Sequence, residues 1–169
     1  MSFKEISADA LVIDPCKKIG KDWFLLAASK KGDGTNAMTA GWGGIGFMWG
    51  KPVFFSVIRP QRYTKEFVDA SDTFSASFFS DDFKNTLSYF GKVSGRAEDK
   101  IKNSALTLLF DGDTPYFSEA QTVFILRKIY RQTFSPDCFL EKEYIDKNYP
   151  MKDFHDMYIS EIVKILVKS

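Results

Sequence analysis

Short apolar runs, each followed by a turn signal, recur along this 169-residue chain and limit what it can fold into. Trp23–Ser29 is apolar and ends at a charged turn with two glycines, after which Ala37–Gly41 returns. This pattern predicts a β-hairpin. Val53–Ile58 is a continuous apolar run of the kind found in sandwich or barrel cores. Because only brief helical segments separate such runs, we expect a mainly β fold, a closed or nearly closed antiparallel barrel.

The remaining segments predict short helices and longer strands. Thr64 is expected to cap a helix that runs to Ala70, because its hydroxyl can accept a free backbone N–H. A second helix, Phe83–Phe90, has Gly91 where a C-terminal cap is wanted. We also expect strands at Thr73–Phe79, Thr122–Ser135 and Met157–Val167, a third short helix at Asp99–Ala105, and an irregular course for the Gly/Trp stretch after Gly41.

The length and charge of the chain narrow its domain organisation and its partners. No repeat, low-complexity tract or linker interrupts the sequence, so residues 1–169 are predicted to form a single domain. With 23 basic and 22 acidic residues, the net charge of +1 gives no field that would gather nucleic acid or an anionic membrane. No apolar stretch approaches the length of a membrane helix, and the first residues lack a secretory pattern. We therefore expect a cytoplasmic protein without nucleic-acid or membrane partners.

Cysteine and histidine are too few for a local metal site. Cys16 and Cys138 lie far apart and His155 is the one histidine, so neither zinc nor iron–sulfur ligation can be assembled from spacing. Both cysteines are expected to be free thiols. His155 stands beside Asp156 near a terminal strand. It is either a proton donor, since histidine titrates near neutrality, or a structural residue.

The glycines follow neither of the common nucleotide-binding motifs. Gly41, Gly43, Gly44 and Gly46 do not form a GxGxxG between a strand and a long helix, and the sequence has no P-loop. Instead, the run Asn36–Gly44 precedes two arginines, Arg59 and Arg62, by about two dozen residues. A side-chain-poor edge followed by two guanidinium groups suits a flat cofactor that carries a phosphate, and we expect a flavin.

Several of these segments together resemble a known family. Asn36-Ala-Met-Thr-Ala-Gly-Trp42, Lys51-Pro52, Arg59-Pro-Gln-Arg-Tyr-Thr-Lys-Glu66, Phe74-Ser-Ala-Ser-Phe78 and Gly91-Lys-Val-Ser-Gly-Arg96 with Asp99-Lys100 occur in the order seen in flavin reductase-like, flavoredoxin-type FMN proteins. The resemblance is strong over about residues 20–110 and weak in the C-terminal third. It implies an FMN-binding split β-barrel of Greek-key type that forms a homodimer, with FMN near the subunit interface.

The resemblance also implies which residues bind FMN. The backbone of Asn36–Trp42, including Met38, Ala40 and Gly41, would contact the edge of the ring, and Thr39 would add a hydroxyl. A small-residue barrel strand that ends in an irregular loop is the alternative for this segment. Trp42 and Trp49 would either shield the flavin or a substrate, or be buried in the core or the dimer.

The phosphate would lie at the other end of the site. Arg59 and Arg62 offer planar donors, and a helix that begins at Thr64 would add free N–H groups and its positive dipole end. A surface salt bridge is the alternative for either arginine. Tyr63 is expected either beside the ribityl chain or in the core.

Two further segments are assigned by the resemblance with less support from the residues themselves. The backbone of Ser77–Phe79 would lie beside the ring, with Phe78 or Phe79 as an apolar neighbour, although core packing explains either phenylalanine. Ser94 and Lys100 are candidate polar contacts at the FMN site or the dimer interface. A turn and a solvated helix face explain these two equally well.

The function implied is that of an FMN-dependent oxidoreductase or electron carrier that moves hydride or electrons through flavin N5. NAD(P)H or a redox protein would be the electron partner. Two alternatives remain: a barrel that binds flavin or haem without turnover, as a sensor, carrier or storage protein, and a cofactor-free interaction domain.

Overall fold

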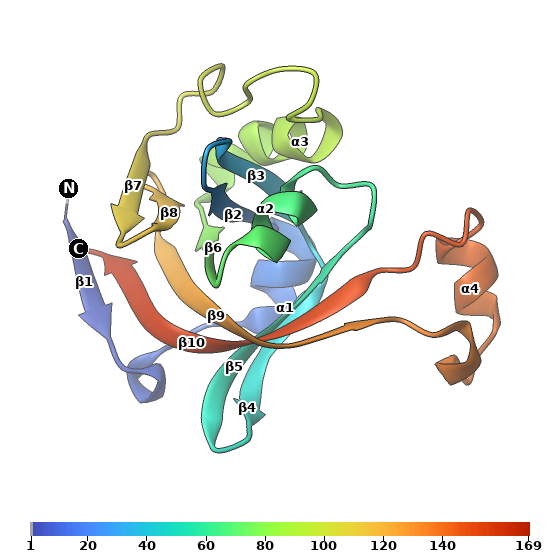
Figure 1. Ribbon diagram of the computed structural model, residues 1–169. Helices are drawn as coiled ribbons and strands as arrows, with labels where there is room; N and C mark the ends of the chain where they lie inside the picture. Colours follow the sequence, from blue (N-terminus) through green and yellow to red (C-terminus); the bar gives the residue numbers. More distant parts are fainter. Residues whose placement is uncertain (1) are drawn as a thin grey trace.

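The computed structural model describes residues 2–169, and most of its strands form one antiparallel sheet that curves into a barrel (Figure 1). Hydrogen bonds connect the strands in the order β3-β2-β6-β9-β10-β5-β4, and β1 pairs with the end of β10. Among the described residues no ladder joins β3 to β4, so the barrel stays open along that edge. The strands are β1 (Phe3–Ile6), β2 (Phe24–Lys30), β3 (Gly34–Ala40), β4 (Gly43–Met48), β5 (Lys51–Ile58), β6 (Thr73–Phe78), β9 (Thr122–Thr133) and β10 (Asp156–Lys168).

The continuous apolar run that predicted β2 reflects burial on both of its faces. Phe24, Leu26 and Ala28 point into the barrel core. Leu25 and Ala27 belong to a second cluster on the outer side of the strand. Because successive side chains of a strand alternate between faces, a strand covered on both sides needs apolar residues at every position.

Phenylalanines from four strands fill the interior of the barrel. Phe24 of β2 stacks on Phe78 of β6, with ring centroids 5.0 Å apart. Phe54 of β5 and Phe124 of β9 complete the group, with centroids 5.6 Å from each other. Large aromatic side chains contribute much of the buried apolar area in a β-rich core. The high phenylalanine content of the sequence is thus used to hold opposite walls of the barrel together.

The Gly/Trp stretch is a strand, and the prediction of an irregular course was wrong. Residues 43–48 form β4, which pairs with β5 from Gly43↔Ser56 to Met48↔Lys51. Trp49 and Gly50 both have positive φ, 53° and 72°, as a two-residue hairpin turn requires. The strand was not predicted because its sequence is rich in glycine, which generally disfavours β structure.

Helix α2 (Thr64–Ala70) has the predicted bounds, but Thr64 does not cap it. Thr64 is the first helical residue, and Tyr63 before it is already helical. The Thr64 hydroxyl instead accepts a hydrogen bond from Asn36 Nδ2, 3.0 Å away. The bond joins β3 to the start of α2.

Helix α3 (Lys84–Lys92) runs through Gly91, so the prediction that Gly91 caps its C-terminus was also wrong. Arg62 donates to the Gly91 carbonyl at 2.8 Å, and Lys100 donates to the Phe90 carbonyl at 3.2 Å. Cationic side chains therefore satisfy carbonyls that the end of a helix leaves free, and a left-handed glycine is not needed.

The third predicted helix, Asp99–Ala105, is a series of turns. The Asp99 carboxylate accepts from the Lys102 N–H, and the Ser104 hydroxyl bonds to the Ile101 carbonyl. Side chains that bond to nearby backbone offer an alternative to helical hydrogen bonds.

Both long C-terminal strands were predicted, but several smaller elements were not. These are β1, the hairpin of β7 (Leu108–Asp111) and β8 (Thr114–Phe117), and helix α4 (Glu143–Asn148). A short helix α1 (Pro15–Lys17) continues into a π-helical turn, Lys18–Asp22. In Figure 1 the ends of β9 and β10 extend away from the barrel, and residues 134–155 between them form an arm that carries α4. Within the described chain, no helix has both the length and the apolar character needed to cross a membrane.

Candidate functional site

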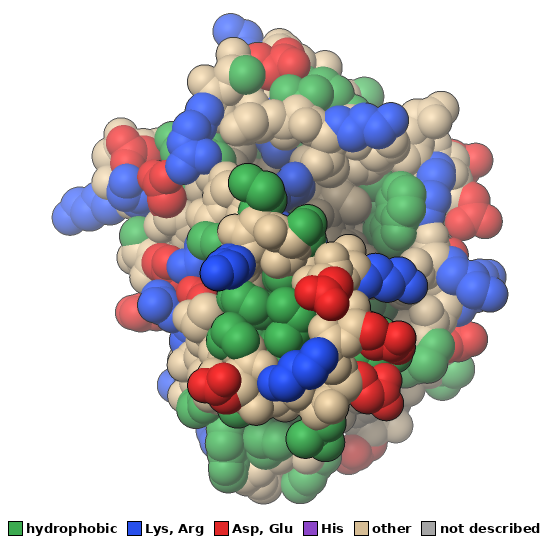
Figure 2. Space-filling model, turned by 90° about the vertical axis from the view of Figure 1, so that its right-hand side faces the viewer, with side chains coloured by type: hydrophobic (Ala, Val, Ile, Leu, Met, Phe, Trp, Pro, Cys, Tyr) green, Lys and Arg blue, Asp and Glu red, His purple; other side chains and the backbone are tan. Residues whose placement is uncertain are grey.

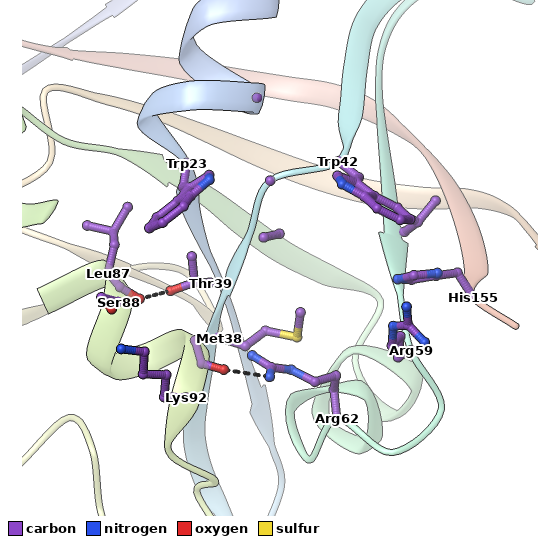
Figure 3. Close-up of a pocket in the computed structure, with 15 residues that line it drawn as sticks. Trp23, Met38, Thr39, Trp42, Arg59, Arg62, Leu87, Ser88, Lys92 and His155 are labelled. Carbon is purple, nitrogen blue, oxygen red and sulfur yellow. Dashed lines mark hydrogen bonds between the residues drawn. The ribbon is translucent and has the colours of Figure 1, made fainter. Parts of the chain in front are cut away.

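A cavity of about 430 Å³ opens beside β3, between α3 and the last residues before β10 (Figure 3). Its size is within the range of small-molecule and cofactor pockets. Residues from five parts of the chain surround it, so the barrel, the segment before β2, helix α3 and the base of the arm all contribute. The lining residues are Gly20, Trp23, Met38, Thr39, Ala40, Gly41, Trp42, Val57, Arg59, Arg62, Leu87, Ser88, Gly91, Lys92 and His155.

A smaller cavity of about 140 Å³ adjoins the first. The two share Met38, Arg62 and Lys92, which places basic side chains at their junction. The smaller cavity is lined by Asn36, Met38, Gln61, Arg62, Tyr63, Thr64, Lys92, Val93, Ser94, Gly95 and Lys100. We refer to the larger as the aromatic cavity and the smaller as the basic cavity.

Strand β3 presents backbone groups to the aromatic cavity. Strand β3 is the end strand of the sheet: one of its edges pairs with β2, and the other edge pairs with no strand in the described chain. The Ala37 carbonyl points away from β2, since it accepts from Lys100 Nζ at 2.7 Å. Backbone groups of alternate residues in an antiparallel strand face the same edge. The N–H and C=O groups of Thr39 therefore also face the open edge, and Gly41 follows directly after the strand.

Two tryptophans form opposite walls of the aromatic cavity, Trp23 before β2 and Trp42 between β3 and β4 (Figure 3). Lys84 lies over the Trp23 ring, with its ammonium 3.5 Å from the centroid. A Cβ on Gly41 would come within 2.8 Å of Trp23 Cδ1. Glycine at position 41 is thus needed for the tryptophan to pack against the end of β3.

The hydroxyl of Thr39 already has a partner inside the protein. It donates to the Leu87 carbonyl of α3, so it ties β3 to that helix (Figure 3). A hydroxyl has one proton to donate. Thr39 can therefore offer a ligand its backbone groups and a lone pair, and no free side-chain donor.

The basic cavity contains two cations, one buried and one half-buried. Lys100 is only 3% exposed, and burial together with the nearby charge of Arg62 lowers the pKa of Lys100 to about 8. Burial also lowers the pKa of Arg62. Both donate to carbonyls at the end of α3, and Lys100 also donates to Ala37. Within residues 2–169 neither cation forms a salt bridge with a carboxylate.

Asn36 and Gly95 shape the wall of the basic cavity. Asn36 is buried and holds Thr64 through its amide nitrogen. A Cβ on Gly95 would lie closer to the Asn36 side chain than van der Waals contact allows. The loop after α3 can approach β3 this closely only with glycine at position 95.

Arg59 lies at the rim of the aromatic cavity and is engaged by the C-terminal arm. Its guanidinium forms an ion pair with Asp153 and donates to the Asn148 carbonyl at 2.8 Å. It also lies over the Tyr149 ring, 5.2 Å from the centroid. The salt bridge that the sequence left open for Arg59 is therefore present, and its partner is on the arm.

His155 reaches the aromatic cavity from the base of the arm (Figure 3). It is 7% exposed, packs against Trp42 with ring centroids 5.1 Å apart, and bonds through Nδ1 to the Tyr149 hydroxyl at 2.9 Å. Burial and the positive charge of Arg59 lower the pKa of His155 to about 4, against the opposing effect of Asp153. The ring is neutral at physiological pH.

The structure separates the predicted site residues into three groups. Met38, Thr39, Ala40, Gly41, Trp42, Arg59, Arg62 and His155 line the aromatic cavity. Asn36, Tyr63, Thr64, Ser94 and Lys100 line the basic cavity, where Tyr63 packs edge-on against Phe67. Ser77, Phe78 and Phe79 are all buried; Phe78 belongs to the core of the barrel and Phe79 to the outer apolar cluster. None of the three lines the aromatic or the basic cavity.

Sequence analysis missed some of the residues that complete the site. Trp23 was assigned to a strand, and Lys92, Gly95 and Tyr149 were given no role. Gly95 and Lys92 fall within the segment Gly91–Arg96 that carried part of the family resemblance, which was the available signal. Tyr149 had no such signal, because only the folded arm brings it to His155.

Solved structures of flavin-related proteins share this fold. An FMN-binding protein from Thermus thermophilus, with bound p-hydroxybenzaldehyde, has a TM-score of 0.69 and 20% identity, covering 98% of this chain and 82% of that one. The flavoredoxin of Desulfovibrio vulgaris (Miyazaki F) has a TM-score of 0.69 and 23% identity, covering 98% and 76%. The styrene monooxygenase flavin reductase of Pseudomonas putida S12 has a TM-score of 0.63 and 13% identity, covering 88% and 80%.

No protein-family model matches the sequence, and no curated protein does. At the identities above, the structural likeness establishes the fold alone. The chain has the split-barrel fold of flavin reductase-like proteins, and the predicted fold class is confirmed.

Proposed function

We propose that this split-barrel protein binds FMN, with the ring system in the aromatic cavity and the phosphate in the basic cavity, and acts as an FMN-dependent oxidoreductase or electron carrier. The FMN-binding protein, the flavoredoxin and the flavin reductase that share its fold support this proposal. FMN, when bound, would supply hydride or electron transfer, and the protein would supply orientation and access.

The main support for the proposal is a pair of neighbouring cations, the buried Lys100 and the half-buried Arg62. A buried charge is costly unless an opposite charge or strong hydrogen bonds compensate it. The carbonyls that accept from these two side chains have no net charge, so two positive charges remain close together. A phosphate in the basic cavity would neutralise them and form charge-assisted hydrogen bonds.

The aromatic cavity fits a planar ring. Trp23 and Trp42 give it broad apolar walls, the free edge of β3 supplies a backbone donor and acceptor at Thr39, and Gly41 also lines the cavity. This is the combination expected for a heterocycle with polar atoms along one edge. The backbone cradle predicted from Asn36–Trp42 is kept in the proposal, with Asn36 assigned to the phosphate end.

Comparison of FMN with riboflavin tests the phosphate assignment directly, because the two ligands differ only by the phosphate. We expect the protein to quench flavin fluorescence on binding and to prefer FMN. Lys100→Met should weaken FMN binding roughly 10- to 100-fold, since a charge-assisted hydrogen bond contributes about 1.5–3 kcal/mol. Riboflavin affinity should change little.

Lys102→Met is the matched control, because Lys102 is exposed and only two residues away. It should leave both affinities unchanged. Equal binding of FMN and riboflavin by the wild-type protein would refute the phosphate site, and failure to bind either would refute the flavin site.

The redox role has its own test. With FMN bound under anaerobic conditions, NADH or NADPH should bleach the flavin absorbance if the protein is a reductase. Bleaching only by a reduced redox protein would identify an electron carrier. Flavin that neither donor reduces would contradict both roles and leave a passive flavin-binding protein.

A further inference from the structure

Tyr149 and His155 form a hydrogen-bonded pair where the arm meets the aromatic cavity. The hydroxyl oxygen of Tyr149 lies 2.9 Å from His155 Nδ1, and both residues are buried. The Tyr149 ring is held in place by Phe154, which stacks on it at 4.8 Å, and by the guanidinium of Arg59. The position of the hydroxyl is therefore fixed by its surroundings.

The direction of this hydrogen bond follows from the available partners. Burial raises the pKa of Tyr149, so the phenol keeps its proton. Within residues 2–169 the Tyr149 hydroxyl has His155 Nδ1 as its one hydrogen-bond partner. A buried O–H group needs an acceptor. The hydroxyl must then donate to Nδ1, which leaves the proton of the neutral imidazole on Nε2.

His155 Nε2 faces the aromatic cavity. No hydrogen bond joins it to any residue in the described chain, and it is not among the buried polar atoms that lack a partner. Figure 3 shows the imidazole directed into the cavity between Trp42 and Arg59. The free N–H therefore points to where a ligand would lie.

We propose that Tyr149 is a positioning residue that holds His155 as its Nε2–H tautomer, so that the cavity offers a neutral hydrogen-bond donor to an acceptor atom on the edge of a bound planar ring. This inference rests on the proposed flavin site for the identity of the ring. The tautomer itself depends only on the protein.

Burial is the main reason that the imidazole stays neutral, and the charged groups around it add to this effect. Arg59 and Asp153 are the charged side chains that affect its pKa, and Arg59 outweighs Asp153. Lys92 and Arg62 add further positive charge to the cavity lining. A second proton on the ring would face these cations without a carboxylate in contact. His155 thus acts as a donor of constant charge across the physiological pH range.

The tautomer can be measured in the ligand-free protein by ¹⁵N NMR of the single histidine. We expect Nε2 to resonate as a protonated ring nitrogen and Nδ1 as an unprotonated one. In Tyr149→Phe, which keeps the ring and its packing, the two tautomers should mix and the pKa of His155 should rise. Tyr144→Phe, on the same arm but exposed, is the matched control and should not differ from wild type.

A flavin-bound readout then tests the role toward the ligand. His155→Phe should shift the visible absorption bands of bound FMN and weaken binding roughly 2- to 10-fold, as expected for one neutral hydrogen bond. Tyr149→Phe should shift the bands in the same direction. The preference for FMN over riboflavin should be unchanged in both variants, because the phosphate end is untouched.

The outcomes separate the two proposals. A wild-type protein with the proton on Nδ1, or an unchanged tautomer ratio in Tyr149→Phe, would overturn the positioning role whether or not flavin binds. The expected tautomer in a protein that fails to bind FMN would support the assignment of Tyr149 and refute the flavin site. Unshifted FMN bands in both variants would refute the contact between His155 and the ring.

Discussion

The protonation of Lys100 is coupled to the proposed binding of the phosphate. Its pKa in the folded protein, about 8, is lower than the ordinary lysine value of 10.5. Free protein therefore loses this charge as the pH rises through 8. A bound phosphate would favour the protonated ammonium and raise its pKa, so binding above pH 8 must take up a proton.

FMN affinity should consequently fall with rising pH. The phosphate is a dianion above about pH 6, so its charge is constant over the range of interest. We expect the Kd for FMN to be roughly tenfold higher at pH 9 than at pH 7. Riboflavin titrated over the same range serves as the control and should show no such rise. A Kd for FMN that does not change with pH would refute the proposal that Lys100 binds the phosphate.

Gly95→Ala should damage the basic cavity, because the new methyl group would overlap the buried side chain of Asn36. Either the Asn36–Thr64 hydrogen bond breaks or the loop after α3 moves away. We expect a loss of roughly 1–3 kcal/mol in the free energy of unfolding and weaker FMN binding. Chemical denaturation and fluorescence titration measure the two effects.

Gly44→Ala is the control for Gly95→Ala, since a Cβ there meets Phe55 at an ordinary 3.7 Å. It should bind FMN as the wild type does. Equal effects of the two substitutions on FMN affinity would contradict the role assigned to Gly95.

The two arginines show which features of the site could be predicted from the sequence and which could not. Arg59 and Arg62 were both predicted at the phosphate end of the site, and both line the aromatic cavity, but only Arg62 also lines the basic cavity. Their partners were not predictable. Asp153 and the carbonyls of α3 are distant in sequence, and only the folded chain decides which group reaches an arginine first.

Among elements, the four phenylalanines inside the barrel determine how its walls meet. Phe78 is 1% exposed and contacts Phe24, Phe54 and Phe124. Phe78→Leu should lower the free energy of unfolding by roughly 1–3 kcal/mol, as a change of shape in a packed core does. FMN affinity should be unchanged, because the ring of Phe78 faces the core.

Phe110→Leu, on β7 and more than half exposed, should change stability by less than about 0.5 kcal/mol. Denaturation with urea compares the two variants. Loss of FMN binding in a folded Phe78→Leu protein would contradict a purely structural role for Phe78. It would support the contact with the flavin ring that the family resemblance implied.

Elements with a strong local signal were predicted well, and those that depend on distant partners were not. Helix α2 and strand β2 follow from their own residues. Strand β4 exists because β5 pairs with it, although its glycines disfavour a strand. Helix α3 extends past Phe90 because Arg62 and Lys100 satisfy its last carbonyls. In both cases tertiary contacts override local propensity.

At the scale of the whole molecule, apolar side chains near the β4–β5 turn indicate a contact surface. Phe47 is 74% exposed and Trp49 is 60% exposed, and Trp49 lies 6.2 Å from Tyr130 on β9. We propose that this surface belongs to the homodimer that the family resemblance implied. Clustered exposed aromatic residues are typical of protein interfaces.

Light scattering after size exclusion should therefore give about twice the 19.3 kDa mass of the chain. Phe47→Lys should shift the protein toward monomer, because a charge would be buried at the interface. Phe110→Lys, on β7, is the control and should remain dimeric. A wild-type mass of one chain would refute the dimer, and a dimeric Phe47→Lys protein would refute this surface.

The arm, residues 134–155, is attached to the barrel through strands β9 and β10. Figure 2 views the end of the molecule to which the arm extends, where hydrophobic side chains lie between acidic and basic ones. Strands β9 and β10 stay paired from the barrel to the start of the arm, with two shifts of register along the way. Both ends of the arm are therefore fixed by strand pairing and by the hydrogen bond from the Phe134 N–H to the His155 carbonyl, and residues 134–155 form no part of the sheet.

That arrangement has an evolutionary consequence. Residues 134–155 bring Tyr149 and His155 to the cavity, while the barrel core lies entirely in other segments. Insertions, deletions or recombination between the ends of β9 and β10 can thus alter which molecules the cavity accepts without disturbing the folding of the barrel. Divergence in substrate preference among such proteins should be concentrated in this one exchangeable segment.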